Sequence, residues 1–367
     1  RRGRAEGVRA GRVVLALGAQ ERPAPFPGWT LPGVLTVGAA QILLKTSRQV
    51  PAEPVWVAGS GPLPLLYMAQ LLRAGGKVAG WLDTSPPGGW RRALPWLGDA
   101  LSAWGDVSKG LAWLREIRAA GVKRVRGVTA LRALGDDRLR EIEYTAGGVT
   151  ARAAASVLLS HEGVVPSIHM TRALECAHSW NAQQACLAPD LDAWGQTSRP
   201  GIYVAGDGAG IGGAQAACVR GELVAAGVAL HAGRLAQPAA DALAAPLRAR
   251  LAGLLRLRPM LDALYPPRAG IFAPSDDTIV CRCEELTAGD IRRAAAIGQP
   301  GPNQIKSYTR AGMGPCQGRQ CGYTIAHIVA AEQQRPVAEV GFYRIRPPLK
   351  PLTLGELASL DIEEEQA

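Results

Sequence analysis

Short apolar runs that end at glycines or at an aspartate alternate with longer stretches of helical character. The apolar runs have the length and composition of buried strands and lie at 13–17, 55–58 and 78–82. Helical stretches are predicted at about 63–73, where Gly75 and Gly76 follow, and directly after Gly213. Strands that alternate with helices predict an α/β fold.

Composition adds limits to this picture. With 367 residues, 47% of them hydrophobic, the chain can bury two or three domain cores. The net charge of +10 would suit an acidic partner or a nucleic acid. Since the arginines are scattered and no basic run is interleaved with aromatic residues, nucleic acid is not an expected partner.

Location can also be predicted from simple features. No run of eighteen apolar residues occurs, so no transmembrane segment is expected. Seven cysteines form an odd count without a secreted disulfide pattern, and no signal peptide is visible. We therefore expect a cytoplasmic protein that meets a membrane only through a partner. Because the chain starts at Arg1 and its first strand follows almost at once, we also expect that the native N-terminus is missing.

The first glycine motif follows the run at 55–58. Gly59-Ser-Gly61-Pro-Leu-Pro resembles the G-x-G-x-x-G phosphate turn, with Pro64 in place of the third glycine. Asp83 stands twenty-four residues after Gly59, at the end of the next strand, where a carboxylate can bind an adenosine ribose. Gly59, Gly61 and Asp83 are thus predicted to hold an adenine nucleotide. The alternative is a similar fold that holds none.

The second glycine motif runs from Gly201 to Gly213. A buried strand leads into Gly206-Asp207-Gly208 and further glycines, and then into an Ala-rich helix. This arrangement is similar to the second flavin motif of two-domain flavoproteins, in which the aspartate bonds a flavin hydroxyl and the helix N-terminus faces the ring. Gly18, in a similar strand and turn, is predicted to help. The alternative is a turn that serves only strand–helix packing.

The cysteines near the end of the chain carry the strongest chemical pattern. Cys281 and Cys283 form a C-x-C pair, and Cys316 and Cys321 form a C-x4-C pair after a gap of thirty-two residues. These spacings differ from the usual zinc-finger pairs. Four thiolates can hold a 2Fe-2S cluster, which moves single electrons. A zinc site and unrelated core cysteines are the alternatives.

Glycines surround the second cysteine pair. They let the backbone approach closely, so its N–H groups can point at the sulfurs. These glycines are Gly312, Gly314, Gly318 and Gly322. The other three cysteines, Cys176, Cys186 and Cys218, lie outside the pattern and are expected to be ordinary buried or partly buried thiols.

Taken together, these motifs resemble a known group of proteins. The cysteine module resembles the 2Fe-2S domain of the bacterioferritin-associated-ferredoxin type. The rest is similar to the two-dinucleotide-binding-domain FAD/NAD(P) oxidoreductase fold. The combination resembles the larger iron–sulfur flavoprotein subunit of multi-subunit amino-acid and imino-acid dehydrogenases of the opine oxidase, hydroxyproline dehydrogenase and hydrogen cyanide synthase type. Further segments that carry this resemblance lie at 160–166, 192–198, 205–214 and 346–351.

The resemblance implies a domain order along the chain. It predicts a discontinuous FAD-binding part, an inserted NAD(P)-like domain, a helical connector, the 2Fe-2S domain and an extended tail. The corresponding ranges are 1–50 with 151–235, then 51–150, 236–274, 275–335 and 336–367. Members of the group begin with a G-x-G-x-x-G turn for the ADP half of FAD. This sequence lacks it, so we expect a fragment without the ADP half-site.

The resemblance also implies a function. The chain would relay electrons for a heteromeric FAD-dependent dehydrogenase of an opine, proline, hydroxyproline or glycine type. A smaller FAD-dependent subunit would oxidise the amine, and a small ferredoxin-like subunit is a further expected partner. We expect His161 and Glu162 to have a structural role, so no catalytic residue is predicted here. The alternatives are a stand-alone NAD(P)H-dependent FAD reductase and a non-catalytic scaffold that binds zinc.

Overall fold

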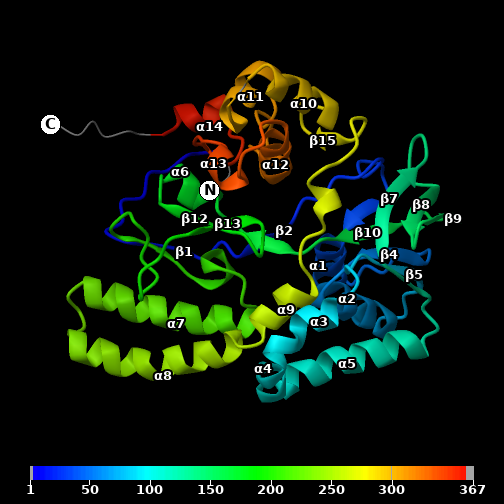
Figure 1. Cartoon of the computed structure of the whole chain (residues 1–367). Helices are drawn as coiled ribbons and strands as arrows, with labels where there is room; N and C mark the ends of the chain where they lie inside the picture. Colours follow the sequence, from blue (N-terminus) through cyan, green and yellow to red (C-terminus); the bar gives the residue numbers. More distant parts are fainter. Residues whose placement is uncertain (1–2, 299, 361–367) are drawn as a thin grey trace.

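A parallel sheet of five strands forms the centre of the half that lies to the right in Figure 1. The computed structural model describes residues 3–298 and 300–360. The strand order is β3-β10-β4-β5-β6. Their bounds are Val34–Thr36 (β3), Val55–Gly59 (β4), Val78–Asp83 (β5), Arg124–Arg126 (β6) and Leu158–His161 (β10). Since β3 and β10 join from outside 51–150, the sheet extends beyond the inserted range, and the predicted division into domains stays a prediction.

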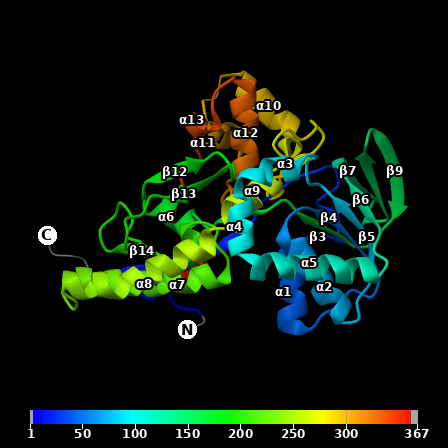
Figure 2. The ribbon, with the colours of Figure 1, turned by 60° about the horizontal axis from the view of Figure 1, so that its bottom comes forward.

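Different layers cover the two faces of this sheet. Helices α1, α2 and α5 pack on one face through a core that includes Val57, Met68 and Ile117. The antiparallel strands β7, β8 and β9 pack on the other face through Leu82 and Ile142. Figure 2 shows these layers on opposite sides of β4 and β5. The bounds are Val37–Ser47 (α1), Pro62–Arg73 (α2), Trp104–Ala119 (α5), Val128–Leu134 (β7), Glu141–Ala146 (β8) and Val149–Ala154 (β9).

Small sheets build the second part of the fold. Strand β1 pairs in parallel with β14, although the two are far apart in sequence. Strand β2 pairs antiparallel with β11, and β12 with β13. The bounds are Val13–Leu15 (β1), Ala19–Glu21 (β2), Val164–Pro166 (β11), His178–Asn181 (β12), Cys186–Pro189 (β13) and Ile202–Val204 (β14). Helix α7 (Ala214–His231) follows β14 as predicted, so the buried strand and its glycine turn lead into a long helix.

The connector is helical, as the sequence predicts. Helix α8 runs beside α7 in both ribbon views, and α9 then packs against α3, which follows β5. One bond that joins these segments runs from Arg92 Nε to Ala263 O at 3.0 Å. The bounds are Gly89–Ala93 (α3), Leu97–Ser102 (α4), Gln237–Leu255 (α8) and Arg258–Leu264 (α9).

The cysteine module lies at the top of Figure 1 and shares its core with two other segments. Ile291 and Ile325 of the module pack in one cluster with Val165 and Ile168 of the second part and with Tyr343 of the tail. The module therefore shares one core with the segment after β10 and with the tail. Its bounds, with the short helices α6 and α14, are His169–Ala173 (α6), Ile279–Cys281 (β15), Leu286–Thr287 (β16), Ala288–Ala296 (α10), Pro302–Thr309 (α11), Gly322–Glu332 (α12), Val337–Val340 (α13) and Leu354–Ala358 (α14).

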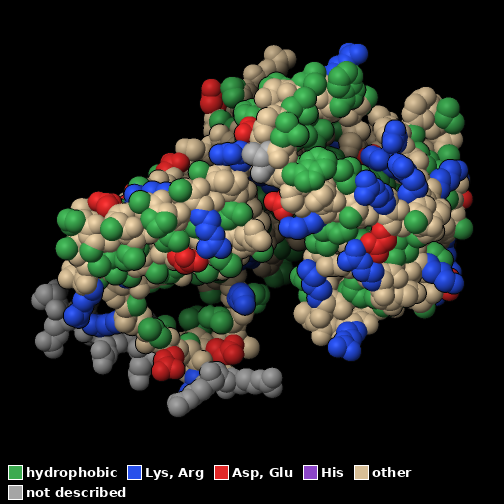
Figure 3. Space-filling view, turned by 90° about the horizontal axis from the view of Figure 1, so that it is seen from below, with side chains coloured by type: hydrophobic (Ala, Val, Ile, Leu, Met, Phe, Trp, Pro, Cys, Tyr) green, Lys and Arg blue, Asp and Glu red, His purple; other side chains and the backbone are tan. Residues whose placement is uncertain are grey.

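The surface agrees with the scattered charge of the sequence. Figure 3 shows many Lys and Arg side chains on the lobe of the five-stranded sheet, spread over it and mixed with Asp and Glu. Among the described helices, none combines the length and the apolar character needed to cross a membrane.

Candidate functional site

The glycines predicted to face a flavin come together where β1 and β14 end. A Cβ atom built on Gly208 would lie 3.5 Å from the carbonyl oxygen of Gly18, so the two turns touch. Gly18 and Gly213 have φ angles of 64° and 85°, which side chains rarely adopt. No atom lies within 4 Å of a Cβ atom built on either of them. The two glycines therefore leave open space next to the N-terminus of α7, as a bound ring system requires.

Asp207 orders this loop from within. Its Oδ1 atom accepts hydrogen bonds from the backbone N–H groups of Gly212 at 2.9 Å and Gly213 at 3.0 Å. Arg220 of α7 reinforces the turn by donating to the carbonyl oxygens of Gly206, at 3.3 Å, and Gly210. One carboxylate oxygen of Asp207 thus stabilises the glycine loop of its own chain. The sequence analysis predicted only the contact between Asp207 and a flavin hydroxyl, and it missed Arg220.

The four predicted cysteine ligands also meet. Cys321 is in side-chain hydrogen-bonding contact with Cys281 and with Cys316, and Cys316 is in the same contact with Cys283. Cys281 and Cys321 are buried, whereas Cys283 is exposed. Two segments separated by more than thirty residues thus place their thiols in one continuous series of contacts. Among the described residues, however, no group of three or more His, Cys, Asp or Glu side chains forms a metal-ion site as it stands.

The surroundings of the thiols favour negative charge on two of them. The hydrogen bond from Cys321 and the backbone N–H groups of Gly312 and Glu284 lower the pKa of Cys281 to about 6. The bond from Cys321 likewise lowers the pKa of Cys316 to about 5. Bonds to both neighbours, together with burial, raise the pKa of Cys321 well above its usual value. Thiolate is the form that binds metals, so the loop suits a cationic centre.

A direct bond joins the cysteine loop to the turn at Gly18, which is predicted to face a flavin. Gln20 stands two residues after Gly18, and its Nε2 atom donates to the carbonyl oxygen of Arg319 at 3.3 Å. Arg319 lies between Cys316 and Cys321, and its guanidinium donates back to the carbonyl oxygen of Cys316 at 3.2 Å. The structure therefore brings the second glycine motif and the cysteine motif into one site.

The first glycine motif lies in the other half of the molecule. Gly59 ends β4, and a Cβ atom on it would lie 2.2 Å from the carbonyl oxygen of His161, so only glycine fits. Gly61 is the residue before α2, as the phosphate turn requires. Asp83 ends β5 and is 2% exposed. Its Oδ2 atom accepts bonds from Arg124 Nε at 3.0 Å and Nη2 at 2.5 Å, and its Oδ1 atom accepts one from the Ser85 N–H at 3.0 Å.

The pairing of Asp83 changes what this edge can bind. Arg124 also lies over the Trp81 ring, with its guanidinium 4.1 Å from the ring centroid, so the ion pair is held in place. A ribose that used Asp83 would share the carboxylate with Arg124. The three predicted residues do share one edge of the sheet, but Arg124 was not predicted because it pairs across forty-one residues of sequence.

Comparisons with known proteins agree with this arrangement. The family model for pyridine nucleotide-disulphide oxidoreductases matches residues 1–221, and the model for the sarcosine oxidase A3 domain matches residues 275–360. The opine oxidase A-subunit of Rhizobium meliloti is 45% identical over 360 residues, which cover 98% of this chain and 68% of that protein. The chain belongs to the opine oxidase A-subunit family.

Other members and one solved structure extend the comparison. Hydrogen cyanide synthase subunit HcnB of Pseudomonas protegens is 32% identical over 365 residues, which cover 97% of this chain and 76% of that protein. The crystal structure of L-proline dehydrogenase from P. horikoshii superposes with a TM-score of 0.69 at 21% identity. It covers 95% of this chain and 58% of that one, and it confirms the FAD/NAD(P) oxidoreductase fold.

Two pairs, each between a glutamate and a basic side chain, join the halves of this opine oxidase-type chain. His161 Nδ1 lies 2.7 Å from Glu21 Oε1, and Glu21 Oε2 accepts from the Gly38 N–H at 2.8 Å. Glu162 pairs with Arg268 of the connector at 2.7 Å. These contacts favour the structural role that the sequence suggested for His161 and Glu162.

The remaining cysteines follow the prediction in part. Cys176 and Cys186 are buried, as expected. The prediction that Cys218 is at least partly buried was wrong, because this residue is exposed on α7.

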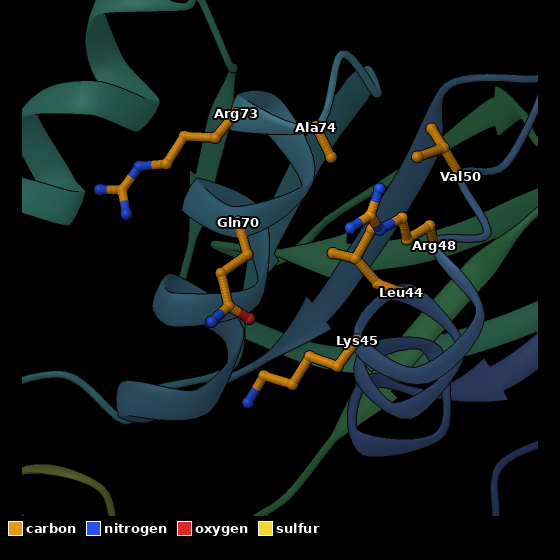
Figure 4. A pocket seen from close by; sticks show the side chains of 7 residues that line it. All are labelled: Leu44, Lys45, Arg48, Val50, Gln70, Arg73 and Ala74. Carbon is orange, nitrogen blue, oxygen red and sulfur yellow. The ribbon is translucent and has the colours of Figure 1, made fainter.

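A further cavity lies away from all predicted site residues. It measures about 530 Å³ and opens between the C-terminal ends of α1 and α2, with Lys45, Arg48 and Gln70 around it. Figure 4 shows that Arg73 turns away toward α5, where it pairs with Glu116 at 2.6 Å. This end of the helices is opposite to the edge at which β4 and β5 finish, so the cavity is separate from the predicted nucleotide site.

Proposed function

We propose that this chain is the electron-transfer flavoprotein subunit of a heteromeric FAD-dependent dehydrogenase that acts on amino or imino acids. The observation that carries the proposal is the Gln20–Arg319 bond, because it holds the flavin turn against the cysteine loop. The names of the relatives support it, since the opine oxidase A-subunit and HcnB are both parts of larger enzymes. In this proposal the substrate pocket lies on a smaller partner subunit.

Gly18, Gly206, Gly208 and Gly213 would line the flavin site, and Asp207 would keep their loop in shape. The open space beside Gly18 and Gly213 fits a bound ring. The N-terminus of α7 lies at the same place and favours negative charge on a bound group. These residues would bind and orient the flavin end of FAD, whereas the ADP half would need residues outside the motifs found here.

Cys281, Cys283, Cys316 and Cys321 would hold a 2Fe-2S cluster. Each iron of such a cluster takes two thiolates. The contacts among the four thiols support this assignment, as does the lowered pKa of Cys281, to which Cys321 and the backbone of Gly312 and Glu284 contribute by hydrogen bonding. When bound, the flavin accepts electrons in pairs and the cluster carries them singly, so the two groups together convert one mode of transfer into the other.

Gly59, Gly61 and Asp83 would bind an adenine nucleotide beside the Arg124–Asp83 ion pair, which leaves the carboxylate less free to accept a bond from a ribose. The ion pair therefore disfavours the rival function of a stand-alone NAD(P)H-dependent reductase, which would need ready binding at this edge. A small ferredoxin-like subunit remains a proposed partner, and the cytoplasm remains the proposed location.

Metal analysis and a visible spectrum of the chain, purified with its partner subunit, test the proposal. We expect about two irons per chain and absorption at about 400–600 nm that dithionite bleaches. A colourless protein with zinc would support the scaffold alternative instead. Flavin bleaching by NADH without any amine would support the reductase alternative.

A further inference from the structure

A second cavity, of about 360 Å³, opens beside the cysteine loop. Its walls come from the C-terminal end of α11, the loop before Cys316 and the tail. Gly312 belongs to this wall, as does Gln317, which directly follows Cys316. A molecule in the cavity would thus lie one residue away from the cysteine cluster. The volume falls in the range of small-molecule sites.

Within the part of the chain that the structure describes, carboxylates pair with two of the four basic side chains around this cavity. Arg310 pairs with Glu284 at 3.0 Å and Arg344 pairs with Glu175 at 2.9 Å. Lys306 also lines the cavity, as does Arg346. Among the described residues, no acidic side chain forms an ion pair with either of these two. Burial lowers the pKa of Lys306, and the nearby positive charge of Arg346 lowers it further. Two cations that approach each other without a carboxylate favour an anion between them.

Gln317 also lines the cavity and bonds to the backbone of the tail. Gln317 donates from Nε2 to the carbonyl oxygens of Arg346 at 3.3 Å and Pro348 at 2.7 Å. These two bonds fix which end of the amide is nitrogen. The other end, Oε1, is buried away from the cavity, so the contribution of Gln317 is to hold the tail that carries Arg346.

The last wall is apolar. Tyr343 is 1% exposed and supports this wall from within, because its ring packs against the glycines of the cysteine loop and lies 5.5 Å from the Lys306 ammonium. Met313 lines the cavity and is 46% exposed. This wall can take the apolar or ring portion of a molecule whose charged group reaches Lys306 and Arg346.

We propose that this cavity binds a small anionic molecule, with its phosphate or carboxylate between Lys306 and Arg346 and its ring or apolar portion against Met313. This inference does not depend on the metal content of the cysteine loop. It concerns binding alone, so it can fail while the electron-transfer proposal stands, and the reverse also holds.

Calorimetric titration of the purified protein at physiological ionic strength tests the inference. The probes are phenyl phosphate, benzoate, inorganic phosphate and phenol, because these separate the two anionic groups from the ring. We expect phenyl phosphate or benzoate to bind and phenol not to bind. Whichever of the two binds identifies the anionic group. Binding of phenol as tightly as the anions, or no binding by any probe, would overturn the proposal.

Three variants locate the binding. Arg346→Ala removes an exposed side chain and should weaken binding about tenfold or more, as expected for one charge-assisted bond. Arg346→Lys should restore most of it. Lys350→Ala, four residues further along the exposed tail, loses the same charge and should leave affinity unchanged. Equal weakening by Arg346→Ala and Lys350→Ala would mean general attraction to a basic surface and would refute a built site.

Discussion

Gly314 offers a sharp test of the cysteine loop. A Cβ atom at this position would lie 2.2 Å from Cys283 Cβ and 3.1 Å from Cys283 Sγ. Gly314 does not have a positive φ angle, so alanine adds no backbone strain. The substitution Gly314→Ala therefore acts through the contact with Cys283 and not through an unfavourable φ angle at residue 314.

The size of the displacement can be worked out from these contacts. Ordinary contact between carbon atoms begins at 3.4 Å, so Cys283 must move by 3.4 − 2.2 = 1.2 Å or more. Metal–ligand distances tolerate about 0.2 Å. Because Cβ is fixed to the backbone, the exposed segment around Cys283 must shift as a whole, which moves Cys283 away from the other thiols. Strain from the added methyl group should cost about 1–3 kcal/mol of stability.

Iron and sulfide content per chain, together with visible absorbance, measure the effect. We expect Gly314→Ala to lose most of its iron and its visible bands while the far-ultraviolet circular dichroism stays unchanged. Gly355→Ala is the matched control, because Gly355 is exposed and no atom lies within 4 Å of a Cβ atom there. Full iron content and an unchanged spectrum in Gly314→Ala would refute the assignment of Cys283 as a ligand.

Three further predictions concern other parts of the molecule. Cys316→Ser should slow turnover with the natural electron acceptor and leave imine formation on the partner subunit intact; unchanged multi-turnover oxidation would contradict this. Asp207→Ala frees the two N–H groups that Oδ1 now binds, so flavin retention after gel filtration should fall, whereas Asp241→Ala on α8 should have no effect. Burial and, to a smaller extent, the charge of Arg22 lower the pKa of His327 from 6.5 to about 4. Between pH 6.5 and pH 4 the unfolded chain therefore binds a proton at His327 more readily than the folded chain does. Stability should therefore fall by up to about 3 kcal/mol as pH drops through this window. His327→Phe keeps the stack on Phe272 and should reduce that loss in urea unfolding at pH 7 and pH 5.

The parts predicted well from sequence are those fixed by local pattern. The strand at 55–59, its glycine turn and the helix from Pro62 are contiguous in sequence. Each of these segments consists of residue types that favour its own conformation, such as proline at the first position of a helix. The strand and helix around Asp207 were predictable for the same reason. Cysteine spacing similarly indicated which thiols would meet, because only these four form close pairs.

The parts that could not be predicted are contacts between distant segments. Arg124 reaches Asp83 from a strand that the pattern cannot align with β5, so the sequence left Asp83 free for a ribose. Gln20 and Arg319 are separated by 299 positions, and neither belongs to a motif. Such pairs depend on how sheets and modules pack, which periodicity along the chain does not encode.

The glycines of the cysteine module need a different explanation from the one that sequence alone offers. From the sequence, these glycines are expected to let backbone N–H groups approach the cysteine sulfurs. The structure instead places the tail against three of them: a Cβ atom on Gly312 or Gly318 would lie 2.7 or 2.4 Å from the Tyr343 ring, and one on Gly322 would lie 2.3 Å from the Phe342 ring. Of the four, Gly314 is the one crowded by a cysteine. The Tyr343 hydroxyl also lies 4.0 Å from Cys321 Sγ. The tail therefore fixes the shape of the loop that carries Cys316 and Cys321, and aromatic packing accounts for most of the glycine content of this loop, with or without a metal.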